Sequence, residues 1–521
     1  MTSSIDLSSR DLEAVAAAIV SHYLNRRMAD IEDLIGGGSD SSYDIIVVGA
    51  GCVGASIARE LSKYDGLRVL VVEQETDVSQ GASKANSGIV HGGYDSKGKW
   101  KAKLERKGNQ MFGKICEDLA VPFKRIGSLV LSFTERDDTE LEKLFVNGHK
   151  NGVDDLEFWD RERVLKEEPH VSVGVRQALY CPSAGIVNPY LYTIASCENA
   201  IENGVEFLLG TKVLKIGKGK EKFELLVENI ETKKQSKLRS RKVVNCAGVW
   251  SDTFAEPGHF EIKPRRGEYF ILSREQGNMA NRVLFQAPTD RWGKGVLVSP
   301  TVDGNLLVGP SASDIPERVN KGTTFQELAY VAWAARRSVP HLDTRLSIRS
   351  FAGIRAKSST GDFVIEEKDG LVHAAGIDSP GLTSSPAIAL EVAKMLKLSN
   401  PVKAHWNGKR RPYDFRTAAR PKEELRYEHS DPELNIVCRC EGITESTIRE
   451  SMMRGLPIRC TDSVKWRTRA GMGVCGGVRC RPHVCELIAE ENNLPDPAKV
   501  PKNVVGQPTP LRLVKTELGR L

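Results

Sequence analysis

Residues 43–75 read YDIIVVGAGCVGASIARELSKYDGLRVLVVEQE, and this segment constrains the fold more than any other part of the chain. It contains an apolar run, the pattern Gly49-x-Gly51-x-x-Gly54, an amphipathic stretch and a second apolar run. Gly49 permits a tight turn, Gly51 lets the backbone approach a pyrophosphate, and Gly54 lets a helix pack closely on a strand. The segment therefore predicts a strand–turn–helix–strand unit that binds a dinucleotide.

The acidic residue that ends the second apolar run supports the same interpretation. Glu73 lies 19 positions past Gly54, where its carboxylate can accept hydrogen bonds from a ribose diol, and its charge disfavours a 2′-phosphate. The N-terminus of the intervening helix would offer free N–H groups to phosphates. A lone GxGxxG pattern arises by chance, but here the strands, helix and acid surround it in the expected order.

From residue 43 to about residue 397, strand-like and helix-like segments alternate, which predicts an α/β fold with an inserted or companion antiparallel sheet domain. Apolar residues recur at helical spacing over 9–35, so we expect an amphipathic helix there that docks on the body or on a partner subunit. We divide the chain into an N-terminal helix with a flexible tether, the α/β body, a polar linker, a cysteine-rich domain and a tail, which span residues 1–42, 43–397, 398–434, 435–490 and 491–521.

Composition and charge argue against a nucleic-acid-binding, membrane-spanning or secreted protein. The net charge of +6 is mild for 521 residues, and no basic patch indicates a nucleic-acid partner. No apolar run is long enough to span a bilayer, and the N-terminus lacks the pattern of a secretory signal. We therefore expect a cytoplasmic protein, although the terminal Gly-Arg-Leu faintly resembles a peroxisome-type address.

Six of the eleven cysteines fall within 48 positions near the C-terminus. Cys438-x-Cys440 and Cys475-x4-Cys480 are separated by 34 residues, and glycines cluster around the second pair. Zinc sites usually use C-x2–4-C pairs, so this spacing suits zinc less well than an iron–sulfur cluster, which takes four thiolates and backbone N–H groups directed at the sulfurs. Scattered free thiols are the remaining alternative.

Three further segments extend the nucleotide motif into a recognisable set: GASKANSGIVHGGY (81–94), KVVNCAGVWSD (242–252) and LVHAAGIDSPGLTSSPAIALEVAKML (371–396). Together they resemble the D-amino-acid-oxidase-like superfamily of FAD enzymes, most closely its glycerol-3-phosphate and 2-hydroxyglutarate dehydrogenase branches. The resemblance implies a Rossmann-like FAD-binding domain and an interleaved antiparallel substrate domain. It assigns FAD contacts to Gly49, Gly51, Gly54, Glu73, Ser83, Asn86, Ser87, Gly88, Val213, Gly248, Trp250, Gly376, Gly381, Leu382 and Thr383.

The same resemblance implies a substrate site. Arg355 matches the position that anchors a small anionic group, and a guanidinium suits this task because its planar fork grips two oxygens. Arg266 and Tyr269 are expected to line the same cavity, and Asp362 to brace the loop. His91 matches a histidine beside the flavin, where it is a candidate base for a hydroxyl proton or simply a hydrogen-bonding partner of the ring.

The segment KWRTRAGMGVC, between the two cysteine pairs, makes residues 436–486 similar to bacterioferritin-associated-ferredoxin-like 2Fe–2S domains. This resemblance implies a small helical domain in which Cys438, Cys440, Cys475 and Cys480 bind the cluster. Lys465, Arg467 and Arg469 would offset the charge of the cluster or lie in solvent.

The two modules together predict an FAD-dependent dehydrogenase that oxidises sn-glycerol 3-phosphate to dihydroxyacetone phosphate and passes electrons through a 2Fe–2S cluster to a protein or quinone acceptor. A 2-hydroxy acid such as 2-hydroxyglutarate, or a small amino acid, is an alternative substrate, because Arg355 could bind either kind of anion. A different class of function, a non-catalytic electron-transfer subunit, also stays open.

Overall fold

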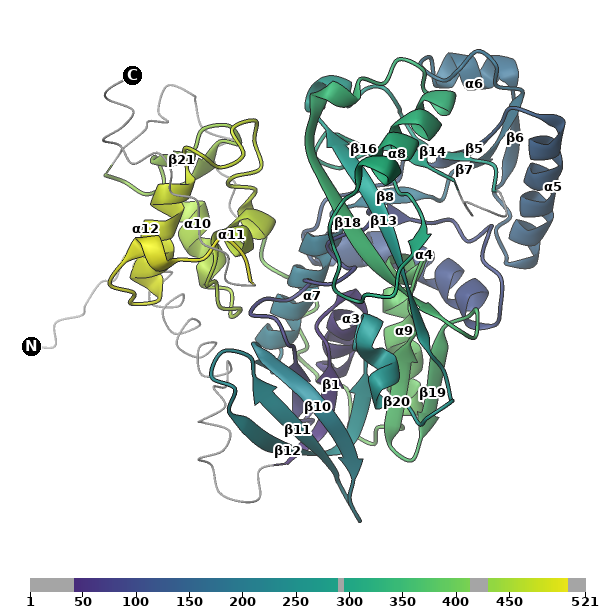
Figure 1. Ribbon diagram of the computed structural model, residues 1–521. Helices are drawn as coiled ribbons and strands as arrows, with labels where there is room; N and C mark the ends of the chain where they lie inside the picture. Colours follow the sequence, from purple (N-terminus) through teal and green to yellow (C-terminus); the bar gives the residue numbers. More distant parts are fainter. Residues whose placement is uncertain (1–41, 289–294, 413–429, 505–521) are drawn as a thin grey trace, which may run out of the picture.

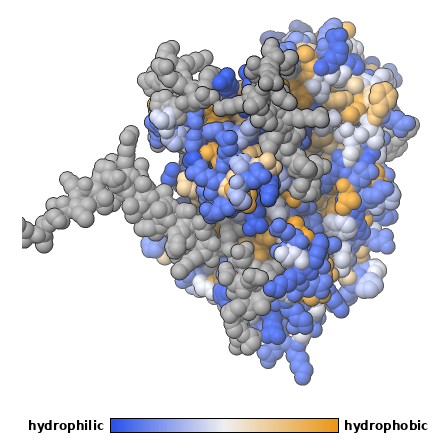
Figure 2. Space-filling model, turned by 60° about the vertical axis from the view of Figure 1, so that its left-hand side comes forward, coloured by the Kyte–Doolittle hydropathy of each residue, from blue (hydrophilic) through white to orange (hydrophobic). Residues whose placement is uncertain are grey.

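The computed structural model describes residues 42–288, 295–412 and 430–504 (Figure 1). Almost all of the expected N-terminal helix and tether, part of the linker and the terminal Gly-Arg-Leu lie outside these residues. Within them, no helix combines the length and apolar character needed to cross a membrane. Figure 2 shows a face on which hydrophilic residues predominate and apolar residues are scattered.

The nucleotide motif folds as predicted. Strand β1 (Tyr43–Val48) leads into helix α3 (Cys52–Leu61), and strand β2 (Val69–Val72) returns parallel to β1. All four β2 residues and nearly all of α3 are buried, because the sheet is covered by helices and a parallel sheet needs apolar residues on both faces.

The sheet around this unit is mixed. Parallel partners β9 (Glu206–Leu208), β12 (Gln235–Asn245) and β20 (Leu371–Ala375) surround β1 and β2. The antiparallel strands β10 (Thr211–Lys218), β11 (Phe223–Asn229) and β19 (Val364–Lys368) extend it. Helices α7 (Pro189–Glu202) and α9 (Gly381–Met395) pack against α3, and their apolar residues form one core with the sheet.

A second, mainly antiparallel sheet forms the other half of the body. Its described strands run in the order β17-β13-β16-β15-β14-β5-β7-β6, and β18 pairs with β13. Their bounds are β5 (Ser128–Ser132), β6 (Glu157–Asp160), β7 (Gln177–Cys181), β13 (Ile262–Leu272), β14 (Val283–Gln286), β15 (Leu297–Pro300), β16 (Leu306–Gly309), β17 (Ser313–Asp314) and β18 (Ser347–Ser358). Helices α5 (Glu135–Lys150), α6 (Arg161–Glu167) and α8 (Phe325–Ser338) cover it (Figure 1).

Short elements join the two halves. The strands β3 (Ile89–Val90), β4 (Phe123–Lys124) and β8 (Gly185–Val187) form a small sheet of their own, and the long helix α4 (Trp100–Asp118) packs on α9. The predicted α/β fold with an interleaved antiparallel domain is confirmed.

The cysteine-rich segment folds as a separate small domain beside α7 (Figure 1). It consists of β21 (Ile436–Cys438), β22 (Ile443–Thr444), α10 (Glu445–Met452), α11 (Thr461–Thr468) and α12 (Arg481–Glu491), around its own apolar core.

Two boundaries differ from the predicted ones. Residues 398–412 pack on the body: Trp406 donates to Ser62 Oγ at 3.0 Å, and the Arg410 side chain is buried. Residues 491–504 belong to the small domain, since Val500 is fully buried in its core and Thr461 donates its N–H to the Pro501 carbonyl. Both segments are polar and contain prolines, so the sequence predicted a linker and a tail. Their contacts are made largely by backbone groups and by isolated side chains, which form no recognisable apolar pattern.

Candidate functional site

The glycine turn between β1 and α3 has no space for side chains. Gly49 has φ +102°, and a Cβ there would lie 2.6 Å from the Cys246 carbonyl oxygen. A Cβ at Gly54 would lie 2.0 Å from the Gly49 carbonyl oxygen. The helix can therefore approach the strand only with glycine at these positions, and the N-terminus of α3 lies at the wall of a cavity, which Gly51, Cys52 and Val53 line.

Two side chains complete this end of the cavity. Glu73 accepts hydrogen bonds from the N–H of Ala50 (2.7 Å) and of Glu75 (3.0 Å), which holds its carboxylate at the tip of β2. Burial raises the pKa of Glu73 to about 7, against the lowering effect of these hydrogen bonds. Ser83 Oγ accepts from the N–H of Cys52 at 2.8 Å and so joins the loop 81–91 to the start of α3.

The loop 81–91 is held by its own hydrogen bonds. Asn86 donates to the carbonyls of Ala82 and Ser83 and accepts from the N–H of Gly88. At its end the His91 N–H donates to Thr383 Oγ1 (3.0 Å) and its carbonyl accepts from Asn109 (2.7 Å). His91 is thereby fixed at the wall of the cavity, beside the Phe285 ring.

One continuous cavity of about 1800 Å³ collects most of the predicted cofactor residues. The residues on its wall are Gly49, Gly51, Glu73, Ser83, Asn86, Ser87, Gly88, Val213, Gly248, Trp250, Gly376, Gly381 and Leu382. Gly54 and Thr383 do not line the cavity. Gly54 lets α3 pack on the glycine turn, and Thr383 accepts the hydrogen bond from the His91 N–H. A cavity of this volume, with the N-termini of α3 and α9 at its wall and the acidic Glu73 beside them, has the parts needed to hold a dinucleotide.

The strand pair β13 and β18 carries the residues that were predicted to bind the substrate, and it forms part of the cavity wall. Their register places Arg265 opposite Arg355, Gly267 opposite Gly353 and Tyr269 opposite Phe351. Cross-strand partners share a face, so these side chains all point to one side. There Arg265, Tyr269, Phe351 and Arg355 line one part of the cavity, called the hollow below. The two glycines let other groups pack closely on the strands, because Ala85 lies over Gly353 and the Arg355 guanidinium lies over Gly267.

Arg355 and Tyr269 lie together at this hollow. The Arg355 guanidinium lies near the Tyr269 side chain and donates to the Ser311 carbonyl at 3.3 Å. The Tyr269 ring stacks on Phe351, with centroids 4.8 Å apart. Burial raises the pKa of Tyr269, while Arg355 lowers it, so the phenol keeps its proton and can donate to an anion.

Arg266 does not reach the cavity. It alternates with Arg265 along β13, and its guanidinium lies 3.1 Å from the buried Glu268 carboxylate on the opposite face. The prediction for Arg266 was wrong because the strand's pleat, which decides between neighbouring residues, could not be fixed from the sequence. Arg265 lines the cavity in its place and pairs with Asp314.

Asp362 has the bracing function predicted for it. Its two carboxylate oxygens accept the N–H groups of Trp100 (2.9 Å) and Lys101 (3.0 Å), the first residues of α4. A carboxylate at a helix N-terminus satisfies otherwise unpaired N–H groups. Asp362 therefore contributes to the structure of the loop and not to the cavity wall.

The four thiols of the small domain lie as two pairs. Cys438 interacts with Cys480, and Cys440 interacts with Cys475. The pKa of Cys438 is lowered by the neighbouring Cys480 thiol and by backbone groups of Gly471 and Glu441. Burial raises the pKa of Cys475, but hydrogen bonds from the backbone of Arg479 and Gly477 outweigh it.

This arrangement differs from a mononuclear site. In the described part of the chain, no three His, Cys, Asp or Glu side chains converge as ligands of one metal ion. Two thiol pairs with backbone N–H groups directed at the sulfurs fit the two irons of a 2Fe–2S cluster better than a single tetrahedral zinc.

Comparisons with known proteins agree with both parts of this geometry. Residues 44–395 match the FAD dependent oxidoreductase family (DAO), and residues 436–490 match the BFD-like [2Fe-2S] binding domain. The chain is a DAO-family FAD-dependent oxidoreductase with a C-terminal 2Fe–2S domain. FAD and the 2Fe–2S cluster are its cofactors, as the sequence predicted.

Individual relatives of this oxidoreductase are informative about the branch. A glycerol 3-phosphate dehydrogenase from Caloramator mitchellensis is 43% identical over 462 residues, which cover 86% of this chain and 94% of the relative. A mitochondrial L-2-hydroxyglutarate dehydrogenase from Mus musculus is 29% identical, over 67% of this chain and 87% of that protein. The dithionite-reduced L-alpha-glycerophosphate oxidase from Mycoplasma pneumoniae with FAD bound superposes with a TM-score of 0.67 at 31% identity, over 71% of this chain and 99% of the oxidase.

The sequence did not predict that the small domain of the oxidoreductase closes part of the cavity. Trp466, Arg469 and Met472 line the cavity together with Tyr190 of α7. Arg467, expected near the cluster or in solvent, is instead buried against the body. No local motif marks these residues, because their neighbours come from segments far away in the chain.

Proposed function

We propose that this oxidoreductase oxidises sn-glycerol 3-phosphate to dihydroxyacetone phosphate and releases the electrons through its 2Fe–2S cluster. The observation that carries the proposal is the hollow on β13 and β18, where Arg355 and Tyr269 face the same cavity as His91 and the flavin-side loop. The relative with 43% identity bears the name of this activity.

The residues divide the chemistry between them. The glycine turn, Glu73 and the loop 81–91 would hold FAD, which would supply the acceptor for the hydride of the carbinol carbon. Arg355 binds the phosphate oxygens as a fork, and the Tyr269 hydroxyl donates a hydrogen bond to the same anion. His91 takes the hydroxyl proton, since an imidazole can act as a base near neutral pH and its backbone is fixed at both N–H and carbonyl. Hydride and proton leave the C–H and O–H bonds, and a ketone results.

The cluster gives the electrons a separate exit. We propose Cys438, Cys440, Cys475 and Cys480 as its ligands. A two-electron reduced flavin and a one-electron cluster suit a dehydrogenase with a protein or quinone acceptor better than an oxidase that reduces oxygen directly. The cytoplasm is the proposed location, because free thiols that bind iron persist in a reducing compartment.

The acceptor is proposed to dock where the thiols approach the surface. Cys440 and Cys475 are partly exposed, whereas Cys438 and Cys480 are buried. Val474 is 90% exposed and Val478 is 48% exposed, on either side of Cys475. Residues 471–481 and 436–440 include Arg439, Arg479 and Arg481 but no acidic residue, so an acidic one-electron carrier with an apolar centre fits this surface.

A charge comparison tests the docking surface. Reduced enzyme should transfer electrons faster to the acidic protein cytochrome b5 than to the basic cytochrome c at low salt, and added salt should reduce the difference. Val474→Asp should slow the transfer to cytochrome b5, while Val173→Asp, at a 73% exposed valine of the body, should not. Equal rates for both cytochromes, or equal effects of both variants, would contradict the proposal.

Anaerobic titration tests the substrate. Addition of sn-glycerol 3-phosphate should bleach the flavin absorption and then the cluster absorption, and L-2-hydroxyglutarate and glycine serve as competing substrates. Bleaching by L-2-hydroxyglutarate alone would support the 2-hydroxy-acid alternative, which the relative from Mus musculus favours. No bleaching by any substrate, with rapid reduction by a reduced flavoprotein, would support a non-catalytic electron-transfer subunit.

A further inference from the structure

Arg467 of α11 makes a fully buried contact with the FAD-binding half of the molecule. Its two terminal nitrogens each lie 2.8 Å from an oxygen of Asp77, and neither side chain has exposed area. Asp77 belongs to the loop after β2, four positions past Glu73. The pair therefore joins the cluster domain to the loop that carries the ribose-type acid.

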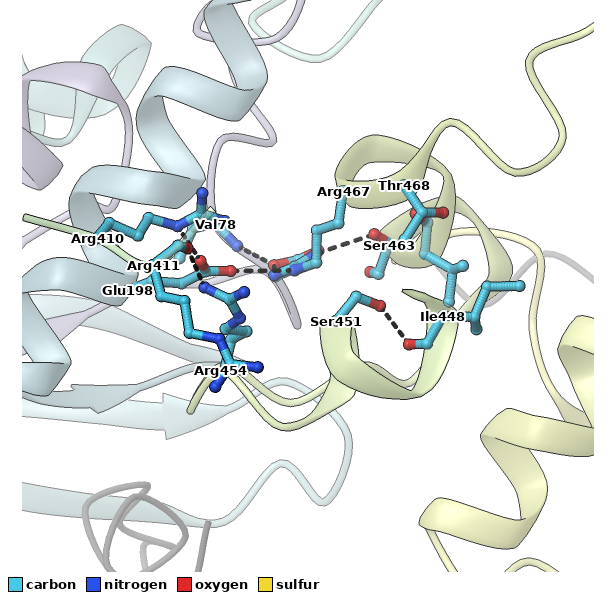
Figure 3. Close-up of polar contacts among 12 residues, drawn as sticks. Val78, Glu198, Arg410, Arg411, Ile448, Ser451, Arg454, Ser463, Arg467 and Thr468 are labelled. Atoms are coloured by element: carbon cyan, nitrogen blue, oxygen red, sulfur yellow. Dashed lines mark hydrogen bonds and ion pairs between the residues drawn. The ribbon is translucent and has the colours of Figure 1, made fainter. Parts of the chain in front are cut away.

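The pair belongs to a larger buried network. Glu198 of α7 lies 3.8 Å from Arg467 Nε through one oxygen and 2.6 Å from Arg410 Nε through the other (Figure 3). Two guanidinium groups and two carboxylates thus balance in a region without solvent. Arg454 of the cluster domain donates to the backbone carbonyls of Arg411 and Pro412. This second contact joins the cluster domain to the segment that carries Arg410.

Buried charges of this kind are poor evidence for extra stability. The loss of hydration offsets much of the attraction between them, and apolar residues of equal size often stabilise a protein as well. A bidentate pair is nevertheless selective in geometry, because its two hydrogen bonds require one orientation of the two partners. The network is therefore suited to fixing how the two domains sit against each other.

The network fixes the part of the cluster domain that lies between the cavity and the thiols, which electrons must cross. Trp466, next to Arg467, packs against the Tyr190 ring with centroids 4.8 Å apart, and both line the cavity. The Tyr190 hydroxyl donates to Met472 Sδ at 3.7 Å. The next residue, Gly473, lies so close to Cys440 that a Cβ there would be 2.1 Å from the Cys440 Cβ. A continuous line of contacts joins the cavity to one thiol.

The glycine motif is joined to the same loop. Ser79, two residues after Asp77, donates its N–H to the Ala50 carbonyl at 3.0 Å, and Ala50 in turn donates to Glu73. A shift of the Arg467–Asp77 pair would thus disturb contacts on both sides of the cavity.

We propose that Arg467 is a positioning residue, which through Asp77 holds the cluster domain at one distance from the flavin end of the cavity. The proposal rests on the proposed function in so far as electrons leave through the cluster. It assigns no part in substrate oxidation to Arg467, which lies outside the substrate hollow.

Stopped-flow measurements on the anaerobic holoenzyme separate the two steps. In Arg467→Met, flavin reduction by glycerol 3-phosphate should stay within about twofold of wild type, while the following cluster reduction should slow about tenfold or more, because small misplacements have large effects on rate. Arg467→Lys keeps the charge but not the planar fork, so its rate of cluster reduction should lie between those of wild type and Arg467→Met. Arg449→Met is the matched control, since this arginine of α10 forms only partly exposed ion pairs within its domain.

Hydrogen exchange of the holoenzyme supplies a readout apart from activity. Amides of α11 should exchange faster in Arg467→Met than in wild type or Arg449→Met, because the domain loses its fixed contact. The double variant Asp77→Leu/Arg467→Met replaces the pair by apolar side chains and keeps the variant foldable if Arg467→Met alone is unstable. It should retain thermal stability yet transfer electrons to the cluster slowly.

The outcomes distinguish the two proposals. Wild-type rates of cluster reduction in Arg467→Met or in the stable double variant would overturn the positioning role, as would equal slowing of both steps. If the wild-type flavin is not reduced by glycerol 3-phosphate, the proposed function fails. The positioning role is then tested by dithionite reduction of the flavin and by α11 exchange.

Discussion

His91 follows β3, Glu73 follows β2 and Arg355 belongs to β18, yet all three line the same cavity. Their environments suit different tasks. His91 is held through its backbone, Arg355 lies beside Tyr269 at the hollow, and Glu73 is partly buried just after β2, where its carboxylate accepts backbone N–H groups. Substitution of each one should therefore change a different measured quantity.

Replacement of His91 should affect the chemical step. In His91→Gln we expect kcat for glycerol 3-phosphate to fall by about 10²–10⁴, the usual contribution of a positioned base. FAD content should be unchanged. A full flavin content with wild-type kcat would restrict His91 to a hydrogen-bonding role.

Replacement of Arg355 should affect substrate binding first. Arg355→Gln removes a charged hydrogen-bond partner worth about 1.5–3 kcal/mol, so kcat/KM should fall about tenfold to a hundredfold, mainly through KM. Steady-state kinetics with glycerol 3-phosphate measure this, and uncharged glycerol is the control substrate. A similar loss with glycerol would show that Arg355 does not act on the phosphate.

Glu73 should make FAD binding depend on pH. Burial raises its pKa to about 7, and only the carboxylate form can accept hydrogen bonds from both hydroxyl groups of the ribose. The acid form dominates below pH 7, so we expect apoprotein to bind FAD about tenfold more weakly at pH 6 than at pH 8. Fluorescence titration measures the affinity. Glu73→Gln should bind weakly at both pH values, and a pH dependence that persists in this variant would refer the effect to another group.

At the scale of elements, the alternation along β13 separates two neighbouring arginines. Arg265 faces the cavity with Tyr269, while Arg266 faces the buried Glu268, which also accepts from the N–H of Thr324 at 2.6 Å. The same pleat gives one face a binding function and the other a structural one.

This alternation predicts a contrast between two strand positions. Arg266→Met leaves the Glu268 carboxylate without its cation, so the free energy of unfolding should fall by about 3–5 kcal/mol. Thermal unfolding measures the loss. The KM for glycerol 3-phosphate should change less than about twofold in Arg266→Met, in contrast to Arg355→Gln. A large increase in KM with unchanged stability would place Arg266 in the substrate site after all.

At the scale of the whole molecule, the DAO-family body and the small domain divide the reaction between them. The body provides the cavity for FAD and substrate, and the small domain provides the four thiols and part of the cavity wall. Substrate oxidation should therefore survive the loss of the cluster, whereas electron exit should not.

Cys475→Ser tests this division. Iron and acid-labile sulfide should fall to near zero, because a hydroxyl is a poor substitute for a thiolate ligand. Flavin reduction by glycerol 3-phosphate should remain, and reduction of cytochrome b5 should be lost. Cys485→Ser is the control, since this buried thiol lies outside both pairs. Retention of iron in Cys475→Ser would exclude Cys475 as a ligand.

Much of this architecture follows from local sequence patterns. The glycine turn, the acid after β2 and the spacing of Cys438, Cys440, Cys475 and Cys480 each depend on residues close together in the chain. A turn that excludes a Cβ indicates a dinucleotide, and the spacing of the thiols favours an iron–sulfur cluster over zinc. The resemblance to known families then assigned FAD and the 2Fe–2S cluster.

The pleat of β13 and the burial of Arg467 were decided by tertiary structure. Whether Arg265 or Arg266 faces the cavity depends on the register with β18, and a shift of one residue would exchange them. Arg467 is one of several basic residues in its segment, and only the approach of Asp77 and Glu198 from distant elements makes it a buried ion pair. Motifs such as the glycine turn and the cysteine pairs depend on residues close together in the chain. Which face of a strand is buried, and which charged side chains form ion pairs, depends on the packing of the whole chain.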